Sequence, residues 1–213
     1  MAGVPMAMDP LNAQGYRTQR AELPEDLWQP LYDRVNYAAA GQSNLSFYSI
    51  PRGQSATLIS PTGTAAAKNK TYRDTNMDNA SVVPTKLYKF VGISVGFVHN
   101  ILTAATNSDD RCKIRDNSVL HFKIVDKDIL YLPMIAIPEV NPIVAVSTTA
   151  NNTSITSFAP GGGLASAMYR FPLAITLNPF ENFLVSIDFD GTQTVTNTLD
   201  VYCILHSFMR RPT

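Results

Sequence analysis

The most constraining feature of this sequence is a succession of short runs in which apolar and polar residues alternate, with turn residues between them. Period-two alternation is typical of half-buried β-strands. The runs lie at residues 45–50, 56–59, 86–99, 119–126, 129–137, 143–148, 153–158, 171–177, 183–189 and 199–209. No convincing helical segment of 10–15 residues lies between them, so the crossovers of a parallel sheet are missing. The pattern predicts an all-β fold with antiparallel sheets, about eight to ten strands forming a sandwich or a barrel.

The longest run, residues 86–99, predicts a strand with two distinct faces. One face is expected to carry Leu87, Lys89, Val91, Ile93, Val95 and Phe97. The opposite face includes Gly92 and Gly96. Glycine inside a strand indicates a bend or the close approach of another backbone.

One short helix is predicted over residues 24–37. Leu27, Leu31 and Val35 have helical spacing, and Pro30 confines the helix to its first turn or kinks it. The aromatic residues of this segment are expected either to pack the helix on a sheet or to form a binding platform, and they are Trp28, Tyr32 and Tyr37.

The remaining segments divide the chain into an arm and one domain. Residues 1–22 lack periodicity and predict an irregular N-terminal arm, and residues 23–213 are expected to form a single domain. The polar stretches 62–83 and 107–112 are expected to be loops.

The charge of the chain limits the kinds of partner that it can bind. The 17 Lys and Arg residues balance the 17 Asp and Glu residues. The arm carries only Arg17 and Arg20 and the C-terminus only Arg210 and Arg211, so we expect no strong sequence-specific nucleic-acid binding. Charged residues make up only 16% of the chain, which favours a surface packed against neighbours, although it also suits a secreted protein.

The sequence also bears on where the chain is made. We find no signal peptide and no run of 18 apolar residues, and we therefore expect a soluble protein made in the cytosol. Cys112 and Cys203 form no metal or redox motif, and both are expected to be reduced.

Residues with catalytic chemistry do not form a recognisable set. No other histidine lies two residues from any of the three, and we expect surface or interface positions for His99, His121 and His206. The carboxylate pairs lie in or beside expected turns, where Asp is favoured by local hydrogen bonding, and they are Asp109/Asp110, Asp126/Asp128 and Asp188/Asp190. The glycines at 161–163 lack the Lys-Ser/Thr of a phosphate loop. We predict no catalytic, cofactor-binding or metal-binding residue and no enzyme activity.

The stretch of residues 169–189 resembles the region of the last strands in jelly-roll major capsid proteins of tailless icosahedral bacteriophages. Those proteins commonly have a Pro-x-Glu-Asn-Phe-x-Val turn before an alternating strand. The turn is filled here by Pro179, Glu181, Asn182, Phe183 and Val185. The resemblance covers about the last 45 residues and, loosely, the strand order before them.

This resemblance implies a single jelly roll that acts as a structural coat protein in the virion. Copies made in the host cytoplasm would assemble as capsomers of an icosahedral shell, with the N-terminal arm bridging subunits. Other virion proteins, such as vertex or minor capsid proteins, and an internal viral membrane are the further partners that it implies. Polar loops at residues 62–78 and 148–163 are candidates for subunit contacts or for the outer surface.

Two alternatives remain open on the sequence. A receptor- or carbohydrate-binding β-sandwich of a virion spike or fibre has the same composition and needs no catalytic residues. A small β-sandwich hydrolase would need a convergent pair among Asp109, Asp110, Asp188 and Asp190, beside aromatic residues.

Overall fold

The computed structural model describes residues 26–60, 64–99, 104–140, 143–149, 152–158 and 168–210. Each of the ten predicted runs overlaps a strand, and every pairing between these strands is antiparallel. Within the described residues there is one α-helix, α1 (Ala104–Asp116), and one 3-10 turn, η1 (Met134–Ala136). The fold is therefore mostly β with antiparallel sheets, as the sequence predicts.

A first sheet of five strands is built around the C-terminal strand. Its members are β1 (Asp26–Trp28), β2 (Leu31–Tyr37), β6 (Leu87–His99), β11 (Tyr169–Leu177) and β13 (Leu199–Arg210). β13 lies between β6 on one side and both β1 and β2 on the other, and β11 pairs with the far side of β6.

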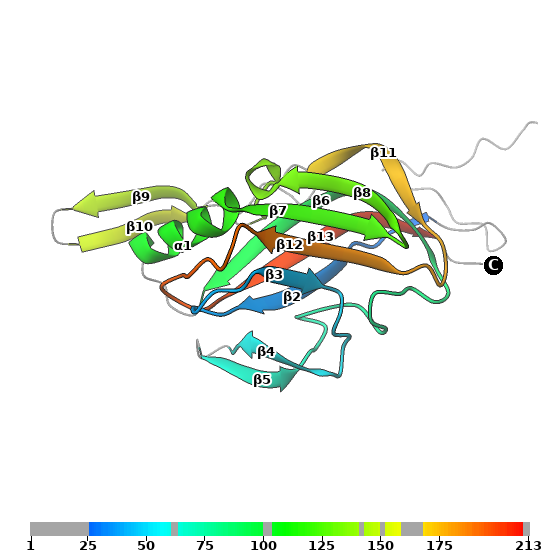
Figure 1. Ribbon diagram of the computed structural model, residues 1–213, viewed down its shortest axis with the longest axis horizontal. Coiled ribbons are helices and arrows are strands. Elements are labelled where there is room, and N and C mark those ends of the chain that lie inside the picture. Colours follow the sequence, from blue (N-terminus) through cyan, green and yellow to red (C-terminus); the bar gives the residue numbers. More distant parts are fainter. Residues whose placement is uncertain are drawn as a thin grey trace, which may run out of the picture.

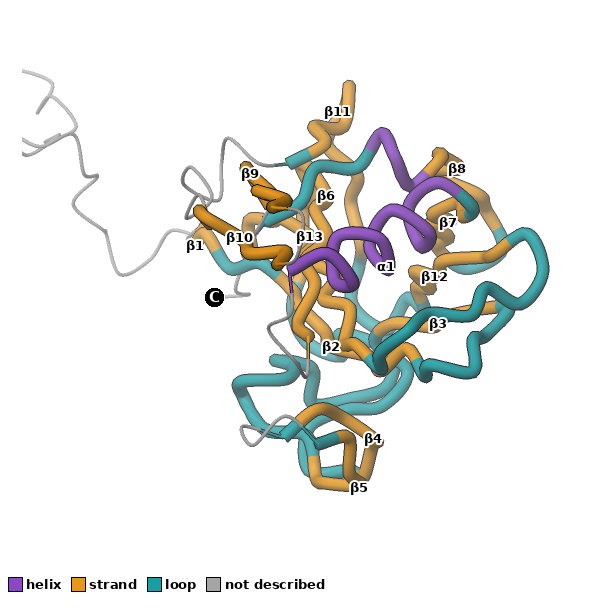
Figure 2. The backbone as a smooth tube through the Cα atoms, turned by 90° about the vertical axis from the view of Figure 1, so that its left-hand side faces the viewer, coloured by secondary structure: helices purple, strands orange, loops and turns teal. Residues whose placement is uncertain are grey.

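A second sheet of four strands packs against the first (Figures 1 and 2). Its order is β3 (Asn44–Phe47), β12 (Phe183–Phe189), β7 (Ser118–Ile124) and β8 (Lys127–Pro133). Aromatic rings join the two layers: the Phe90 ring on β6 lies 5.7 Å from the Phe122 ring on β7 and 6.2 Å from the Phe183 ring on β12. The buried side chains of both sheets form one hydrophobic core.

Two hairpins lie outside these sheets. They are formed by β4 (Ser55–Ile59) with β5 (Ala65–Asn69), and by β9 (Ile143–Thr149) with β10 (Asn152–Phe158). The first lies beside β2, while the second lies with α1 at the end of the molecule drawn on the left of Figure 1. The segment 62–83, expected to be a loop, therefore contains β5.

The faces of β6 differ from the prediction because the strand has a bulge. Phe90 pairs with Ser207 and Gly92 with His206, so Val91 is an extra residue opposite β13. The core therefore receives Tyr88 and Phe90 before the bulge and Ile93, Val95 and Phe97 after it. A bulge inserts one residue and reverses the alternation beyond it.

The predicted close approach of a backbone at Gly92 is confirmed. A Cβ atom at this position would lie 2.7 Å from the carbonyl oxygen of Tyr169 on the neighbouring strand β11.

The helix predicted over residues 24–37 is wrong, because the segment forms β1 and β2. Pro30 separates the two strands, and both pair along β13. The helical spacing of Leu27, Leu31 and Val35 was coincidental, since pairing with a buried strand outweighs a weak local pattern.

The loop predicted at residues 107–112 is also wrong, because these residues belong to α1. The helix is polar and has no apolar stripe, so the sequence lacked the usual signal. Tertiary contacts hold it instead. The buried Asp110 carboxylate accepts hydrogen bonds from the backbone N–H groups of Thr196 (2.8 Å) and Asn197 (3.1 Å), and Arg111 forms an ion pair with Glu139 (3.2 Å).

Candidate assembly surface

Two turns at one end of the molecule have unusual backbone conformations. Val125, in the turn between β7 and β8, has φ 53°, and Phe180, in the corner between β11 and β12, has φ 66°. This left-handed region costs a residue with a Cβ atom roughly 1–2 kcal/mol, and it is rarest for β-branched and bulky residues. Both side chains nevertheless lie in solvent, at 55% and 72% exposure. The two turns therefore direct apolar groups outward from a strained backbone.

Backbone hydrogen bonds tie these turns to their neighbours. The N–H of Val125 donates to the carbonyl of Asn182 (2.8 Å), and the N–H of Phe180 donates to the carbonyl of Val83 (3.1 Å). Ser81 and Tyr48 also have positive φ. The N–H of Ser81 donates to the carbonyl of Tyr48 (2.8 Å). The surrounding structure thus holds the strained conformations in place.

The Pro-x-Glu-Asn-Phe-x-Val turn forms the corner between β11 and β12. Its Glu181 carboxylate accepts hydrogen bonds from the backbone N–H (2.8 Å) and the side-chain amide (3.0 Å) of Asn178, and these bonds lower the pKa of Glu181. Phe183 and Val185 are buried, as the motif predicts for the start of the next strand. The turn-closing role of Glu181 was not expected from the sequence.

A cavity of about 470 Å³ opens between these two turns. It lies beside β8 and β11, which are edge strands of the two sheets. Val125, Ile129 and Ile175 supply apolar surface to its lining. Its charged lining residues are two carboxylates, Asp126 and Glu181, and one ammonium group, Lys127. The cavity is therefore apolar with a small excess of negative charge.

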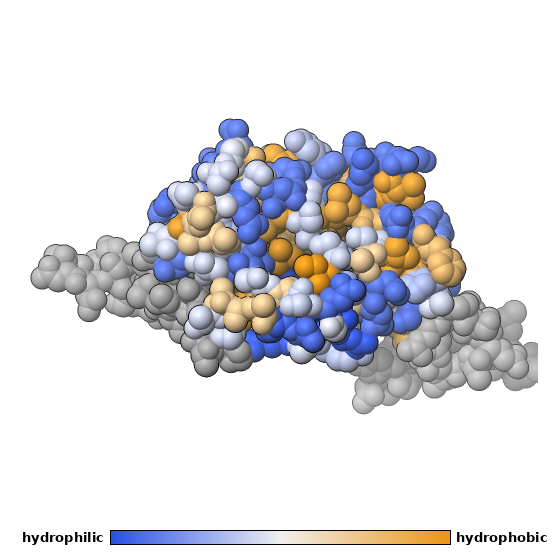
Figure 3. All heavy atoms as spheres, turned by 60° about the horizontal axis from the view of Figure 1, so that its bottom comes forward, coloured by the Kyte–Doolittle hydropathy of each residue, from blue (hydrophilic) through white to orange (hydrophobic). Residues whose placement is uncertain are grey.

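A second apolar surface lies on the outer face of the first sheet. The Trp28 ring on β1 lies 5.1 Å from the Phe208 ring on β13 in an edge-to-face arrangement. The two side chains are 43% and 38% exposed. Exposed aromatic pairs of this kind are enriched where proteins bind one another. On the face shown in Figure 3, hydrophobic residues likewise form separate patches among polar ones.

His206 lies beneath Trp28, with the two ring centroids 5.9 Å apart. Its Nε2 atom shares a hydrogen bond with the Ser94 hydroxyl (2.8 Å), and its buried Nδ1 atom has no partner among the described residues. Burial lowers the pKa of His206. The expected surface or interface position of this histidine is therefore wrong. Its side chain points away from the core, but it is buried in the isolated chain.

The aromatic residues weighed as one platform are divided between the two faces of the sheet. Tyr37 is buried and packs against Phe189, with centroids 5.1 Å apart. The Tyr32 hydroxyl donates to the Tyr72 carbonyl (2.5 Å). Of the three, Trp28 is the exposed one, at 43%.

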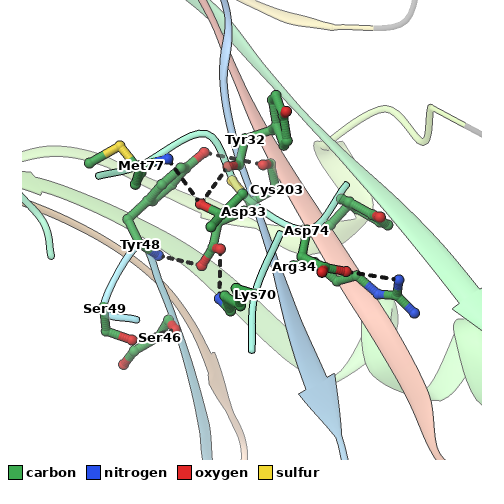
Figure 4. Close-up of polar contacts among 12 residues, drawn as sticks. Tyr32, Asp33, Arg34, Ser46, Tyr48, Ser49, Lys70, Asp74, Met77 and Cys203 are labelled. Atoms are coloured by element: carbon green, nitrogen blue, oxygen red, sulfur yellow. Dashed lines mark hydrogen bonds and ion pairs between the residues drawn. The ribbon is translucent and has the colours of Figure 1, made fainter. Parts of the chain in front are cut away.

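A buried charge network fixes the long segment between β3 and β6 (Figure 4). Asp33 and Arg34 are adjacent on β2 and fully buried. The Asp33 carboxylate accepts hydrogen bonds from the Lys70 ammonium (2.6 Å) and the backbone N–H of Tyr48 (2.7 Å). Burial raises the pKa of Asp33, and the Lys70 charge opposes that effect.

Arg34 makes the other half of this network. Its Nε donates to Asp200 on β13 (2.6 Å), and its Nη2 donates to the backbone carbonyl of Ile59 on β4 (2.8 Å). A longer contact joins its Nη1 to Asp74 (3.3 Å), which also binds the Lys68 ammonium. These contacts bind the β4–β5 hairpin to the first sheet, which is a structural role.

Three of the four carboxylates weighed for hydrolysis have separate local partners. Asp109 pairs with Lys113 on the surface of α1 (2.8 Å), and Asp188 accepts a hydrogen bond from the Asn44 side chain. Asp110 caps backbone N–H groups as described above, and Asp190 is exposed beside its turn. None of the four lines the cavity of about 470 Å³, or a smaller cavity of about 80 Å³ lined by Met77 and Tyr88 among others.

Other candidate residues also have local roles. His121 pairs with Asp128 across the β7–β8 hairpin (2.8 Å), and the side chain of His99 lies outside the described residues. Both cysteines are free, as expected: Cys112 is exposed and Cys203 is buried. Within the described parts of the chain, no group of three or more metal-ligating side chains lies together.

Two expected features lie outside the described residues: the arm at residues 1–22 and the glycines at 161–163. None of the helices that are described is long and apolar enough to cross a bilayer. No protein-family model matches the chain, and no curated protein matches it in sequence.

Proposed function

We propose that this chain is a viral coat protein of the single jelly-roll type, which assembles into an icosahedral shell around a genome. The strand order is the observation that carries the proposal. Along the chain, the eight main strands of the two sheets are β2, β3, β6, β7, β8, β11, β12 and β13. They fall into the orders β2-β13-β6-β11 and β3-β12-β7-β8. This order supports two sheets wound as a jelly roll, an architecture found in viral capsid and lectin domains.

The surface of the molecule supports an assembly role. Strained turns hold Val125 and Phe180 in solvent, and Trp28 and Phe208 lie exposed on another face. Separate apolar patches of this kind favour contacts with several neighbours. In the shell, individually weak contacts would add to a stable assembly because each copy makes many of them.

The partners in this proposal are copies of the same chain, together with vertex or minor capsid proteins and, in virions that have one, an internal membrane. The proposed location is the virion. A receptor- or carbohydrate-binding head of a spike or fibre is the competing proposal, since lectin domains share the architecture.

Light scattering on the purified chain, over a range of salt and protein concentrations, tests the proposal. A coat protein is expected to reach particles of megadalton mass. A compact trimer or pentamer under every condition would favour the spike or fibre head instead.

A further inference from the structure

We propose that copies of this chain associate head to tail, with the Trp28–Phe208 pair of one copy seated in the cavity between the β7–β8 and β11–β12 turns of the next. The inference rests on the proposed function and names the contact through which copies meet. The aromatic surface is defined as Trp28, Phe208 and Lys89, and the receiving cavity is the one lined by Val125, Asp126 and Ile175.

The aromatic surface is a single row of cross-strand neighbours. Trp28 on β1 pairs with Phe208 on β13, and Phe208 pairs with Lys89 on β6. Cross-strand partners point to the same face of a sheet. Because Met209 and Tyr88, the next residues along these strands, are in the core, the row lies on the outer face. Two exposed rings therefore lie beside one ammonium group.

The receiving cavity complements this surface in apolar character and charge. Its apolar lining suits an aromatic side chain, and Val125 in that lining is 55% exposed. Its two carboxylates outnumber its single ammonium group, which favours a cation at the rim. Carboxylates are ionised near neutral pH, and the hydrogen bonds from Asn178 that lower the pKa of Glu181 extend its charge to more acidic conditions. Lys89 is the cation that accompanies the rings.

One copy cannot satisfy both surfaces by itself. The row continues from Lys89 to Thr176 on β11, and Thr176 lines the cavity. Trp28 on β1 and Phe208 on β13 therefore lie three and two strand spacings from β11, or roughly 14 Å and 10 Å from the strand that lines the cavity. A contact in which the rings of one copy fill the cavity of the next, with no reciprocal contact between the same two copies, is heterologous and closes into a ring when the rotation between copies allows it. Rings of this kind would be the capsomers of the proposed shell.

Exchanging charges across the contact tests the inference on the full-length chain. Lys89→Glu puts a carboxylate beside the rings, and Asp126→Lys puts an ammonium group on the cavity rim. Asp126 is exposed and Lys89 is partly exposed, so both variants are expected to melt at the wild-type temperature. Each variant alone is expected to associate at least about tenfold more weakly than wild type, as measured by sedimentation velocity.

The mixture of the two variants gives the decisive result. In an equimolar mixture, the aromatic surface of the Lys89→Glu variant can meet the cavity of the Asp126→Lys variant. The unchanged aromatic surface of the second variant can likewise meet the unchanged cavity of the first, so every contact is complementary in an assembly where the two variants alternate. Association is expected to return to within about twofold of wild type. Asp116→Lys, a matched reversal at an exposed position of α1, serves as the control and is expected to associate like wild type.

Two results would overturn the inference. Either variant could associate as strongly as wild type, or both could associate weakly with no recovery in the mixture. In both cases wild-type particles would still support the coat-protein proposal. A wild-type chain that never associates would instead contradict both proposals.

Discussion

The two thiols of this chain lie in opposite environments. Cys112 is exposed on α1, whereas Cys203 lies in the core, where burial raises its pKa to about 12. Thiol reagents attack the thiolate, so a buried thiol with a raised pKa is unreactive.

We therefore expect a thiol-reactive dye to label one cysteine per folded chain and two per chain in denaturant. Mass spectrometry of the digested protein should assign the first label to Cys112. Rapid labelling of Cys203 in the folded protein would show that the strand β13 is not packed as described.

His206 makes stability depend on pH. Burial lowers its pKa below the ordinary 6.5, so the unfolded chain binds a proton at pH values where the folded chain does not. The free energy of unfolding should therefore fall as the pH drops from about 6.5 towards the folded-state pKa of His206. Glu181, whose pKa is lowered by its hydrogen bonds with Asn178, contributes in a different window, below about pH 4.5.

Urea unfolding of His206→Gln between pH 7 and pH 5 checks this expectation. The variant should lose most of the decrease in stability that wild type shows over this range. A wild-type slope in the variant would mean that another group is responsible.

At the scale of elements, the β4–β5 hairpin depends on the buried Arg34. Removing one partner from a buried ion pair leaves the other charges without compensation and typically costs about 3–5 kcal/mol. We expect Arg34→Met to lower the free energy of unfolding by roughly this amount, because Asp200 stays buried on β13.

Arg52→Met is the matched control for this prediction. Arg52 pairs with the exposed Asp78 and stacks on the exposed Tyr72, and surface pairs contribute at most about 1 kcal/mol. Equal losses from the two variants in urea unfolding would contradict the structural role given to Arg34.

Most strands could be predicted from the sequence because they satisfy a local rule. In β7, β12 and β13, a buried face alternates with a more exposed one, and alternation is visible in the residue pattern itself. β1 and β2 were assigned to a helix because only their pairing with β13 decides their conformation. α1 was not predicted because it has no apolar stripe. It is held by hydrogen bonds from the backbone N–H groups of Thr196 and Asn197 to its Asp110 carboxylate, and by ion pairs with Glu139.

The candidate assembly surface was predictable only in part. The motif around Pro179 located the β11–β12 corner, and Phe183 starts the next strand as expected. Nothing in the residue pattern indicates a left-handed Val125, since β-branched residues rarely adopt that conformation. Similarly, the pairing of Lys70 with Asp33 joins positions 37 residues apart and depends on the completed fold.

At the scale of the whole molecule, the free edges of the sheets need an explanation. β8 and β3 end the second sheet, and β11 ends the first, leaving unpaired backbone groups that invite aggregation. The register of β11 against β6 breaks between Arg170 and Ile175, which interrupts one edge. A closed shell would cover the remaining edges with neighbouring copies.

Residues 1–22 are expected to act in assembly and not in folding. The described core begins after them and includes both sheets. A chain lacking these residues should therefore unfold at a denaturant concentration close to that of wild type, yet fail to form normal particles. Normal particles from the shortened chain, seen by light scattering, would show that the arm is dispensable.

Negative-stain electron microscopy of the purified full-length chain, over a range of salt and protein concentrations, tests the central claim most directly. The coat-protein account predicts closed particles of uniform diameter or regular hexagonal sheets of rings. Small, compact oligomers or monomers in every condition would contradict it.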